Sequence, residues 1–517
     1  MEKIFARKAS GLVRTVSAWD TLIYNLLVMA PTAVYVYGIW ASLLFPGVDL
    51  PLTALIAIPV CVVVGLFYAL YSAAMPRSGG DYVWVSRVLH PALGFMMNFF
   101  LFVVLLSVAG SYIPWFLQWG IAPIFQFVGQ TAVSEMLTPP MVTFAVALVF
   151  FLICALIVSR GAKATAIALW VFFAFTVLGF LAYVGTLATG PEQFKATFDA
   201  LSGMKYDDAI EAAKAAGYSG AFSAEATSLG VIFTIINFLG FNCSVFIAGE
   251  IKEVRKAQFI AIIGAVVIFG IVTWAVYQAT YYAMGAQFVT SIAYLAGTGD
   301  PSYKLPFAIP FFQFLFMYAT TNPLAYGIAL FGWSMMTLAA ILTYIFTSVR
   351  LVFAWSFDRV LPTALSKVDS RYGSPYMALI LVTVLTILFQ ALWLFTPILS
   401  YFVYIVTGWF ITTAIASISG IIFPYRRKDI FEASPSIVKA KIGGVYWITV
   451  LGVLSLIVSA WMAYAGMMPA ISGAVNPLAV EFSFGVFIVG LIIYAVSWLY
   501  HRRKIPLELS FKEIPPE

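Results

Sequence analysis

Runs of apolar residues, each about twenty positions long, follow one another along most of the chain, with short polar segments between them. A helix needs about 20 consecutive apolar residues to cross the hydrocarbon core of a bilayer. The pattern predicts an all-α integral membrane protein with about twelve transmembrane helices. They are expected at residues 17–44, 51–75, 92–120, 139–158, 164–188, 228–249, 258–284, 326–349, 376–395, 398–423, 443–467 and 482–500.

Two segments between these helices have features of their own. Residues 307–318 are apolar but too few to span, so we expect a re-entrant or surface segment there. Residues 189–227 form the one long loop, in which Asp207, Asp208 and Glu211 shortly precede Lys214. Acids near the start of a helix favour it, which predicts a short surface helix. This loop is expected to be a solvated lid or, alternatively, to take a direct part in substrate capture.

The basic residues are divided unequally between the two sides of the predicted bundle. If the N-terminus is cytoplasmic, 24 of the 28 Lys and Arg residues fall in inside segments, among them Arg350 in the loop after residue 349. Positive residues concentrate on the cytoplasmic side of membrane proteins. We therefore expect a plasma-membrane protein with both termini in the cytoplasm and no Lys or Arg left for the membrane interior.

Composition supports a membrane protein and excludes other classes. Of the 517 residues, 62% are hydrophobic and 10% are charged, against about 25% charged in soluble domains. The formal charge of +6 lies in short loops, so we do not expect nucleic acid as a partner. Cys61, Cys154 and Cys243 lie inside apolar runs without metal-ligand spacing, so no metal site or cofactor is expected.

Two predicted helices carry a break in the middle. Pro31 removes a backbone donor and clashes with the carbonyl of Leu27. Gly240 lies at mid-span of the sixth helix, between Asn237 and Asn242. In hydrocarbon, broken backbone is tolerated only where it is buried in protein or lines a cavity.

The two breaks stand at matching places, five helices apart. Either break alone is also typical of a packing kink. Interrupted helices in corresponding positions of two halves point to a substrate site between inverted repeats. The N-terminus of a half-helix would bind a carboxylate, and free carbonyls at a C-terminus would face an ammonium group or a cation.

Groups for catalysis or energy conversion are few. Asp20 is the only acid expected near a span interior, at the cytoplasmic start of the first helix, and the two histidines, His90 and His501, lie at inside edges. This inventory argues against a membrane enzyme, a long proton relay and a voltage sensor. The chain has no phosphate-binding ATPase motif, so the energy for transport would come from a gradient or from exchange.

Four segments, taken in order, resemble the amino acid–polyamine–organocation superfamily, and the resemblance covers roughly residues 10–430. They are PRSGGDYVWVSRVLHPALGF (76–95), FLGFNCSVFIAGEIKEVRKA (238–257), SVRLVFAWSFDRVLP (348–362) and SRYGSPYMAL (370–379).

This resemblance implies a LeuT-type fold and transport of amino acids or related amines by alternating access. The fold has two inverted five-helix repeats, with discontinuous helices 1 and 6, and two peripheral helices. The expected divisions are 1–16 (cytoplasmic), 17–188 (first repeat), 189–227 (extracellular loop), 228–423 (second repeat), 424–442 (cytoplasmic loop), 443–500 (helices 11 and 12) and 501–517 (cytoplasmic tail).

The resemblance also implies that substrate meets the unwound stretches of helices 1 and 6. Position 242 is Asn where many members carry Glu, and helix 5 lacks the interior Lys of proton-coupled relatives, so proton coupling through that lysine is not expected. Matching on the breaks places these residues at the site: Val28, Met29, Ala30, Pro31, Asn237, Phe238, Leu239, Gly240, Phe241 and Asn242.

Further candidates carry polar side chains on neighbouring stretches. Asn25, just before the first break, either lines the pocket or ties helices together. Ser107 and Ser111 lie four residues apart on one helix face and either face the cavity or bond to their own helix. As in sodium-coupled relatives, Thr343 would offer an oxygen to a sodium ion held by helix 1 carbonyls such as that of Val28.

Two motifs near the inside edges suggest gates. Gly79 and Gly80 permit a tight turn, either in a loop that re-enters helix 3 or in a gate. Glu250, at the exit of helix 6, either joins a cytoplasmic gate network with Arg14 or Arg87 or forms a surface ion pair of small worth.

The sequence therefore predicts a secondary active transporter that works by symport with Na⁺ or H⁺ or by exchange. Neutral amino acids are favoured, because the expected pocket lacks the acid that a buried dication would need. The alternative is a non-transporting membrane amino acid sensor on the same fold. A channel and a membrane enzyme fit less well. The expected partners are the amino acid, the coupling ion and the lipid bilayer.

Overall fold

The structure, a computed structural model, describes residues 11–29, 31–402, 404–472, 476–502 and 506–514. Within these ranges eleven helices are long and apolar enough to cross a membrane, counting α1–α2 and α5–η1–α6 as one helix each. The helices are α1 (Ala18–Val28), α2 (Ala33–Leu44), α3 (Leu50–Ala74), α5 (Pro91–Pro114), the π-helical η1 (Trp115–Ile121), α6 (Ala122–Phe127), α8 (Pro140–Ser159), α9 (Gly161–Leu187), α13 (Val254–Met284), α16 (Pro323–Phe357), α17 (Tyr376–Phe395), α18 (Ile405–Arg426), α21 (Trp447–Ala465) and α23 (Pro477–Arg502).

A twelfth crossing is made of two shorter pieces. Helix α12 (Ala224–Asn237) is apolar but has only 14 residues. After a turn it is continued by the 3₁₀ helix η2 (Cys243–Glu250). The twelve apolar runs therefore correspond to twelve crossings, and the predicted all-α multi-pass fold is confirmed.

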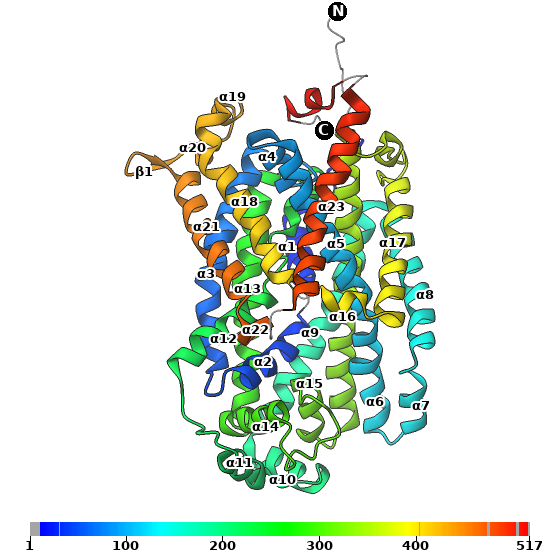
Figure 1. Ribbon diagram of the computed structural model, residues 1–517. Helices are drawn as coiled ribbons and strands as arrows, with labels where there is room; N and C mark the ends of the chain where they lie inside the picture. Colours follow the sequence, from blue (N-terminus) through cyan, green and yellow to red (C-terminus); the bar gives the residue numbers. More distant parts are fainter. Residues whose placement is uncertain (1–10, 30, 403, 473–475, 503–505, 515–517) are drawn as a thin grey trace, which may run out of the picture.

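The long helices run side by side, and short elements gather at both ends of the bundle (Figure 1). Helix α4 (Asp81–Val88) lies at one end, which we call the α4 end. Helices α10 (Pro191–Leu201), α11 (Tyr206–Ala215) and α14 (Ala286–Thr298) lie at the other, which we call the α14 end. The remaining short elements are α7 (Thr131–Met136), α15 (Phe312–Leu315), η3 (Phe316–Tyr318), η4 (Thr363–Ser366), η5 (Ile398–Tyr401), α19 (Lys428–Glu432), α20 (Ser436–Lys439), β1 (Lys441–Ile442), β2 (Val445–Tyr446), α22 (Pro469–Ser472) and η6 (Leu507–Phe511).

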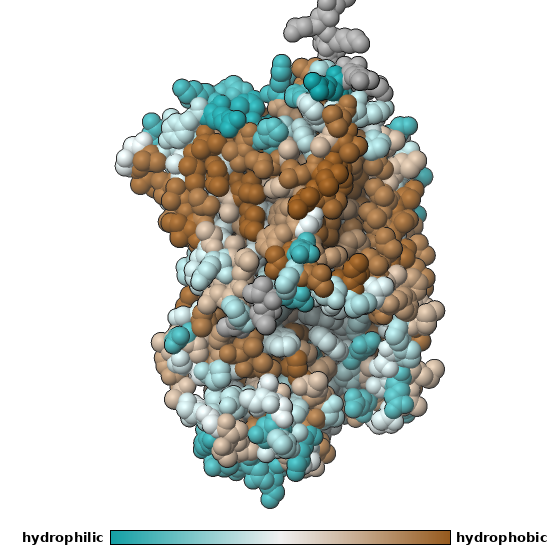
Figure 2. All heavy atoms as spheres, in the orientation of Figure 1, coloured by the Kyte–Doolittle hydropathy of each residue, from teal (hydrophilic) through white to brown (hydrophobic). Residues whose placement is uncertain are grey.

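The sides of the bundle are apolar. Figure 2 shows hydrophobic residues over the flanks and hydrophilic residues concentrated at the two ends. Large side chains such as Leu156, Leu181, Ile457 and Val496 point outward and are more than half exposed. An apolar surface of this extent is unfavourable in water and matches the hydrocarbon of a bilayer.

Both predicted helix breaks are present. Helix α1 ends at Val28 and α2 begins at Ala33. Gly240 has a φ of +105°, a conformation that side-chain-bearing residues rarely adopt, and a Cβ added there would lie 3.1 Å from the carbonyl oxygen of Val28. The two breaks therefore touch each other inside the bundle.

The segments at the α14 end agree in part with the sequence analysis. The surface helix expected before Lys214 is present as α11. Residues 307–318 do not span, as predicted, and fold inward as α15 and η3 with Phe312 and Phe316 buried. Helix α14, which packs against α2, was not predicted, because its mixed polarity breaks the apolar pattern.

The expectation that Arg350 lies in a loop is wrong. Helix α16 continues to Phe357, eight residues beyond the predicted end, and Arg350 lies inside it, fully buried rather than in a loop. A guanidinium is tolerated there because Glu250 neutralises it and the ring of Phe346 lies 3.7 Å from its Cζ. Asp20 does lie where it was expected, in the first turn of α1, capped by Ser17.

Candidate functional site

A cavity of about 380 Å³ lies where the two helix breaks meet. This volume falls in the range of pockets that hold small-molecule ligands. Six crossings and the η5 segment supply its walls. The lining residues are Val28, Met29, Ala33, Tyr37, Val104, Leu105, Ser107, Val108, Ser111, Tyr112, Trp115, Ile236, Leu239, Gly240, Tyr344, Trp393, Leu399, Ser400, Phe402, Ile405, Val406 and Trp409.

The polar groups of this cavity are uncharged. None of the described residues that line it is Asp, Glu, Lys, Arg or His. Hydroxyl groups come from serines and tyrosines, and the Ser111 hydroxyl already donates to the carbonyl of Val108 at 2.9 Å. The backbone at Val28 and Gly240 adds peptide groups. Such a cavity offers hydrogen bonds and apolar surface, but no counter-ion for a net charge.

Six of the residues proposed from the sequence line the cavity. They are Val28, Met29, Ser107, Ser111, Leu239 and Gly240.

The remaining proposed residues lie elsewhere. Asn25 binds η2 instead: its Nδ2 donates to Ser244 Oγ and its Oδ1 accepts from the Ser244 N–H, both at 3.0 Å. Thr343 donates to the Ala340 carbonyl at 2.7 Å. Ala30 lies outside the described residues. Pro31, Asn237, Phe238, Phe241 and Asn242 are buried near the breaks without lining the cavity.

The sixth crossing, made of α12 and η2, carries two buried amides with spare hydrogen-bonding capacity. Asn237 Nδ2 donates to the Tyr277 hydroxyl at 3.4 Å. Within the described part of the chain, the amide oxygens of Asn237 and Asn242 have no partner. Both residues flank Gly240, so the break is surrounded by acceptors that a donor could still engage.

Several lining residues were missed by the sequence analysis although helical spacing marks some of them. Val104, Val108 and Trp115 share the face of α5 that carries Ser107 and Ser111. Phe402, Ile405, Val406 and Trp409 form a second such face. The first group could have been predicted, because its members lie three or four positions from Ser107 or Ser111 along the same helix. No polar residue in the second group indicates that its face lines a cavity.

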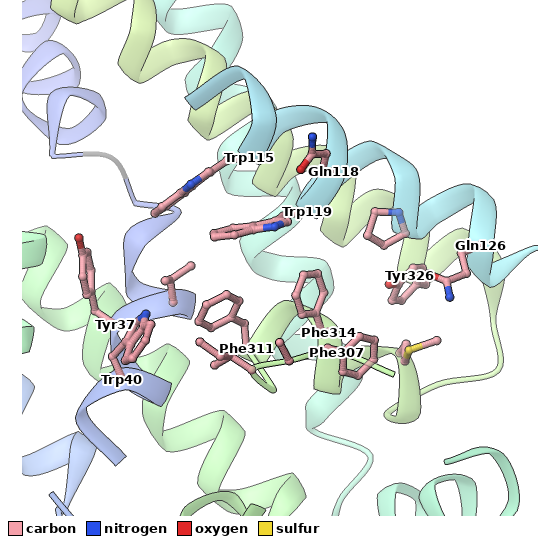
Figure 3. Close-up of a pocket in the computed structure, with 15 residues that line it drawn as sticks. Tyr37, Trp40, Trp115, Gln118, Trp119, Gln126, Phe307, Phe311, Phe314 and Tyr326 are labelled. Carbon is pink, nitrogen blue, oxygen red and sulfur yellow. The ribbon is translucent and has the colours of Figure 1, made fainter. Parts of the chain in front are cut away.

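A second cavity, of about 530 Å³, adjoins the first on the side of the α14 end. Figure 3 shows its walls, with Trp40 on one side and Trp119, Phe311 and Phe314 on the other. Tyr37 and Trp115 line both cavities, and we call this pair the aromatic partition. These two side chains belong to the walls of both the inner and the outer cavity.

Toward the α4 end the path is closed by backbone pairing. The N–H groups of Thr15 and Val16 both donate to the carbonyl of Glu250 at 3.0 Å, and Lys252 N–H donates to the carbonyl of Val16 at 2.8 Å. The Glu250 carboxylate accepts two hydrogen bonds of 2.8 Å from Arg350. The segment before helix 1, the exit of helix 6 and α16 are therefore fastened together. The sequence suggested Arg14 or Arg87 as the partner of the Glu250 carboxylate, whereas in the structure its partner is Arg350.

Comparison with known families identifies the chain. Residues 22–496 match the family model described as Amino acid permease. The chain belongs to this family. No curated protein matches it significantly. The permease is thus a multi-pass membrane transporter for amino acids rather than an enzyme, in agreement with the resemblance seen in the sequence.

A second set of contacts closes the α4 end of the permease. Arg87 of α4 pairs with Asp358, which follows α16, at 2.7 Å, and both side chains are buried. Its guanidinium also donates to the carbonyl of Ser510 at 3.4 Å, and Phe511 lies 5.0 Å from it. The tail segment 506–513 is held further by Arg359 and Arg427, which donate to the carbonyls of Pro506 and Lys512. The tail therefore bridges the loops that follow three different crossings.

Proposed function

We propose that this permease is a secondary active transporter of neutral, largely apolar amino acids, driven by symport with Na⁺ or H⁺ or by exchange. The observation that carries the proposal is the uncharged cavity at the meeting point of the two helix breaks. We place the α4 end in the cytoplasm and the permease in the plasma membrane, because the basic residues concentrate in the segments expected inside.

The two charged groups of an amino acid find backbone partners at the breaks. The start of α2 presents N–H groups and the positive end of a helix dipole, which suit a carboxylate. Carbonyls at the ends of α1 and α12 suit an ammonium group. The side chain would then meet apolar walls such as Leu105, Ile236 and Trp409. A dication would remain without a counter-ion, which is strongly unfavourable in a buried site.

Transport requires the two ends to open in turn. The contacts of Glu250 with Arg350, and of Val16 with the exit of helix 6, hold the α4 end shut, whereas the aromatic partition is the barrier on the other side. Alternation would exchange these two barriers as one bundle of helices rocks against a scaffold around the site. Val28 and Thr343 are the candidates for contacts to a coupling cation.

Uptake into proteoliposomes tests the proposal. A sodium gradient, a proton gradient and a preloaded amino acid interior are imposed in turn on the purified protein. Saturable uptake of leucine or methionine under one condition supports the proposal and names the energy source. Stronger competition by arginine or putrescine than by leucine would overturn the substrate class. Ligand-dependent thermal stabilisation without flux under all three conditions would favour the alternative of a membrane amino acid sensor.

A further inference from the structure

Asp81 is a buried carboxyl group that the cavity and the closing contacts leave unexplained. It is the first residue of α4 and its side chain is only 3% exposed. One carboxyl oxygen accepts from Asn98 Nδ2 at 3.1 Å, and the other from the Tyr68 hydroxyl at 3.4 Å. Asn98 is held in turn by Trp355 Nε1 at 2.8 Å. Neutral donors from α3 and α5 therefore surround the group.

No cation from the described part of the chain pairs with this carboxyl group. Among the described residues Asp81 has no salt bridge, whereas the buried acids Glu250 and Asp358 each pair with an arginine. The titratable groups that face it are Tyr68 from α3 and Cys243 from η2. The other facing groups are Asn98 and, behind it, Trp355 of α16. On its own helix Arg87 is engaged by Asp358.

Burial without a cation penalises the ionised form. Desolvation raises the pKa of Asp81 from 3.8 to about 7, although hydrogen bonds from Asn98, the Tyr82 backbone and Tyr68 act in the opposite direction. The group therefore changes its charge within the physiological range of pH, provided that its surroundings stay dry.

The turn before Asp81 is fitted against the two elements that close the α4 end. Gly79 N–H donates to the carbonyl of Phe246 in η2 at 3.0 Å. A Cβ added at Gly80 would lie 2.5 Å from Val245, and one added at Gly79 would lie 2.7 Å from the Cβ of Ala354 in α16. Because η2 and α16 are also joined by Glu250 and Arg350, separating them would expose this turn to water.

We propose that Asp81 is a proton-binding site linked to the cytoplasmic opening of the permease, loaded while the α4 end is closed and emptied into the cytoplasm when it opens. The proposal rests on the proposed function, in which that end opens toward the cytoplasm during transport. The proposed proton-binding group is therefore a carboxyl group of α4. It is not a lysine of the fifth predicted helix, because that helix has no lysine in its interior.

The direction of the pH effect follows from linkage. In the closed state the carboxyl group has a pKa of about 7, and after hydration it returns toward 3.8. Between these values the closed state binds more protons, so acid favours closure and rising pH favours opening. The effect is about tenfold for each pH unit inside this window and levels off above pH 7.

Thiol labelling measures the opening without requiring transport. Val16→Cys places a thiol at a position that is buried in the closed state, and the three native cysteines are buried. The purified variant in lipid nanodiscs is labelled with a maleimide from pH 5 to pH 8, and each rate is divided by that of the unfolded chain at the same pH. The chain without the added cysteine gives the background.

The proposal expects the corrected labelling rate to rise at least tenfold from pH 5 to pH 8. Asp81→Asn should abolish this rise and leave labelling slow throughout. Asp207→Asn, which removes an exposed acid, should retain the rise. Asn98→Ala should move the midpoint of the curve of labelling rate against pH to a higher pH, since it removes a donor that stabilises the carboxylate. If Asn98 had only a structural role, its loss would not shift this midpoint.

The outcomes separate this inference from the proposed function. A flat profile in the parent chain, or an unchanged rise in Asp81→Asn, overturns the proton site even if amino acid uptake is found. If Asp81→Asn does not fold, an unmoved midpoint in Asn98→Ala overturns it. A rise that depends on Asp81, together with no uptake of any amino acid, supports the site and overturns only the transport proposal.

Discussion

Glu250 and Arg350, one hundred positions apart in sequence, form a buried bidentate ion pair with both N–O distances at 2.8 Å. The pair joins the end of η2 to the C-terminal part of α16. Since Glu250 also accepts backbone hydrogen bonds from Thr15 and Val16, one residue links three segments of the α4 end.

Removing one partner of this pair is expected to destabilise the protein strongly. Glu250→Gln leaves a buried guanidinium without its counter-ion, which costs about 3–5 kcal/mol. Thermal unfolding of the purified protein in detergent measures the loss. The matched control is Asp207→Asn, which breaks the exposed pair with Lys195, also at 2.8 Å, and should leave the stability almost unchanged. Equal shifts in the two variants would contradict a structural role for the buried pair.

Gly240→Ala is expected to reduce transport more than tenfold. The new methyl group would occupy a backbone conformation with φ +105° and crowd the carbonyl of Val28 at 3.1 Å, a strain of about 1–3 kcal/mol. Uptake into proteoliposomes gives the rate, and size-exclusion chromatography shows whether the variant folds. Gly185→Ala, in α9 with nothing within 4 Å of the added carbon, serves as the control and should transport normally. Normal transport by Gly240→Ala would contradict a precise contact between the two breaks.

Ser111→Asp is expected to change the substrate preference toward cations. The side chain lines the cavity, so the substitution supplies the acid that is absent there. Competition assays should show weaker binding of leucine and new competition by arginine. Ser111→Ala, which adds no charge, should keep the preference for neutral amino acids. An unchanged preference in Ser111→Asp would show that substrate binds elsewhere.

Trp115→Ala is expected to raise the KM severalfold with a smaller effect on the maximal rate. The indole stacks between Tyr112 and Trp119, at 5.0 and 4.8 Å between ring centres, and lines both cavities. Figure 3 shows it beside Trp119 at the outer cavity. Its loss merges the cavities and lets bound substrate escape toward the α14 end. Trp461→Ala, on the exposed flank of α21, is the control. If both variants behave alike, Trp115 is not part of a barrier.

Much of the fold could be predicted because bilayer crossing demands an uninterrupted apolar run. The twelve crossings, the two breaks and the face of Ser107 and Ser111 all follow from local spacing. The predicted end of α16 was wrong for a physical reason. Arg350 ends the apolar run but not the helix, because a carboxylate from another crossing neutralises it.

The rest of the site depends on how distant segments pack. Nothing near Trp393 or Trp409 in the sequence shows that they face the cavity, since both lie within long, mostly apolar runs. The π-helical turn at Trp115–Ile121 likewise follows from packing, where Gly120 meets the side chain of Ser334 on α16. The spacing of residues along a helix shows which of them share a face, but it does not show which other segment packs against that face.

The docked tail sets an order of events during synthesis. Arg87 precedes Ser510, whose carbonyl it binds, by 423 residues. At about 5–20 residues per second, the arginine emerges from the ribosome roughly 20–85 s before this acceptor exists. The last native contacts at this end therefore form long after Arg87 has been synthesised. A chain cut between residues 502 and 506 would keep its twelve crossings but would lack these contacts, and with them the final closure of the α4 end.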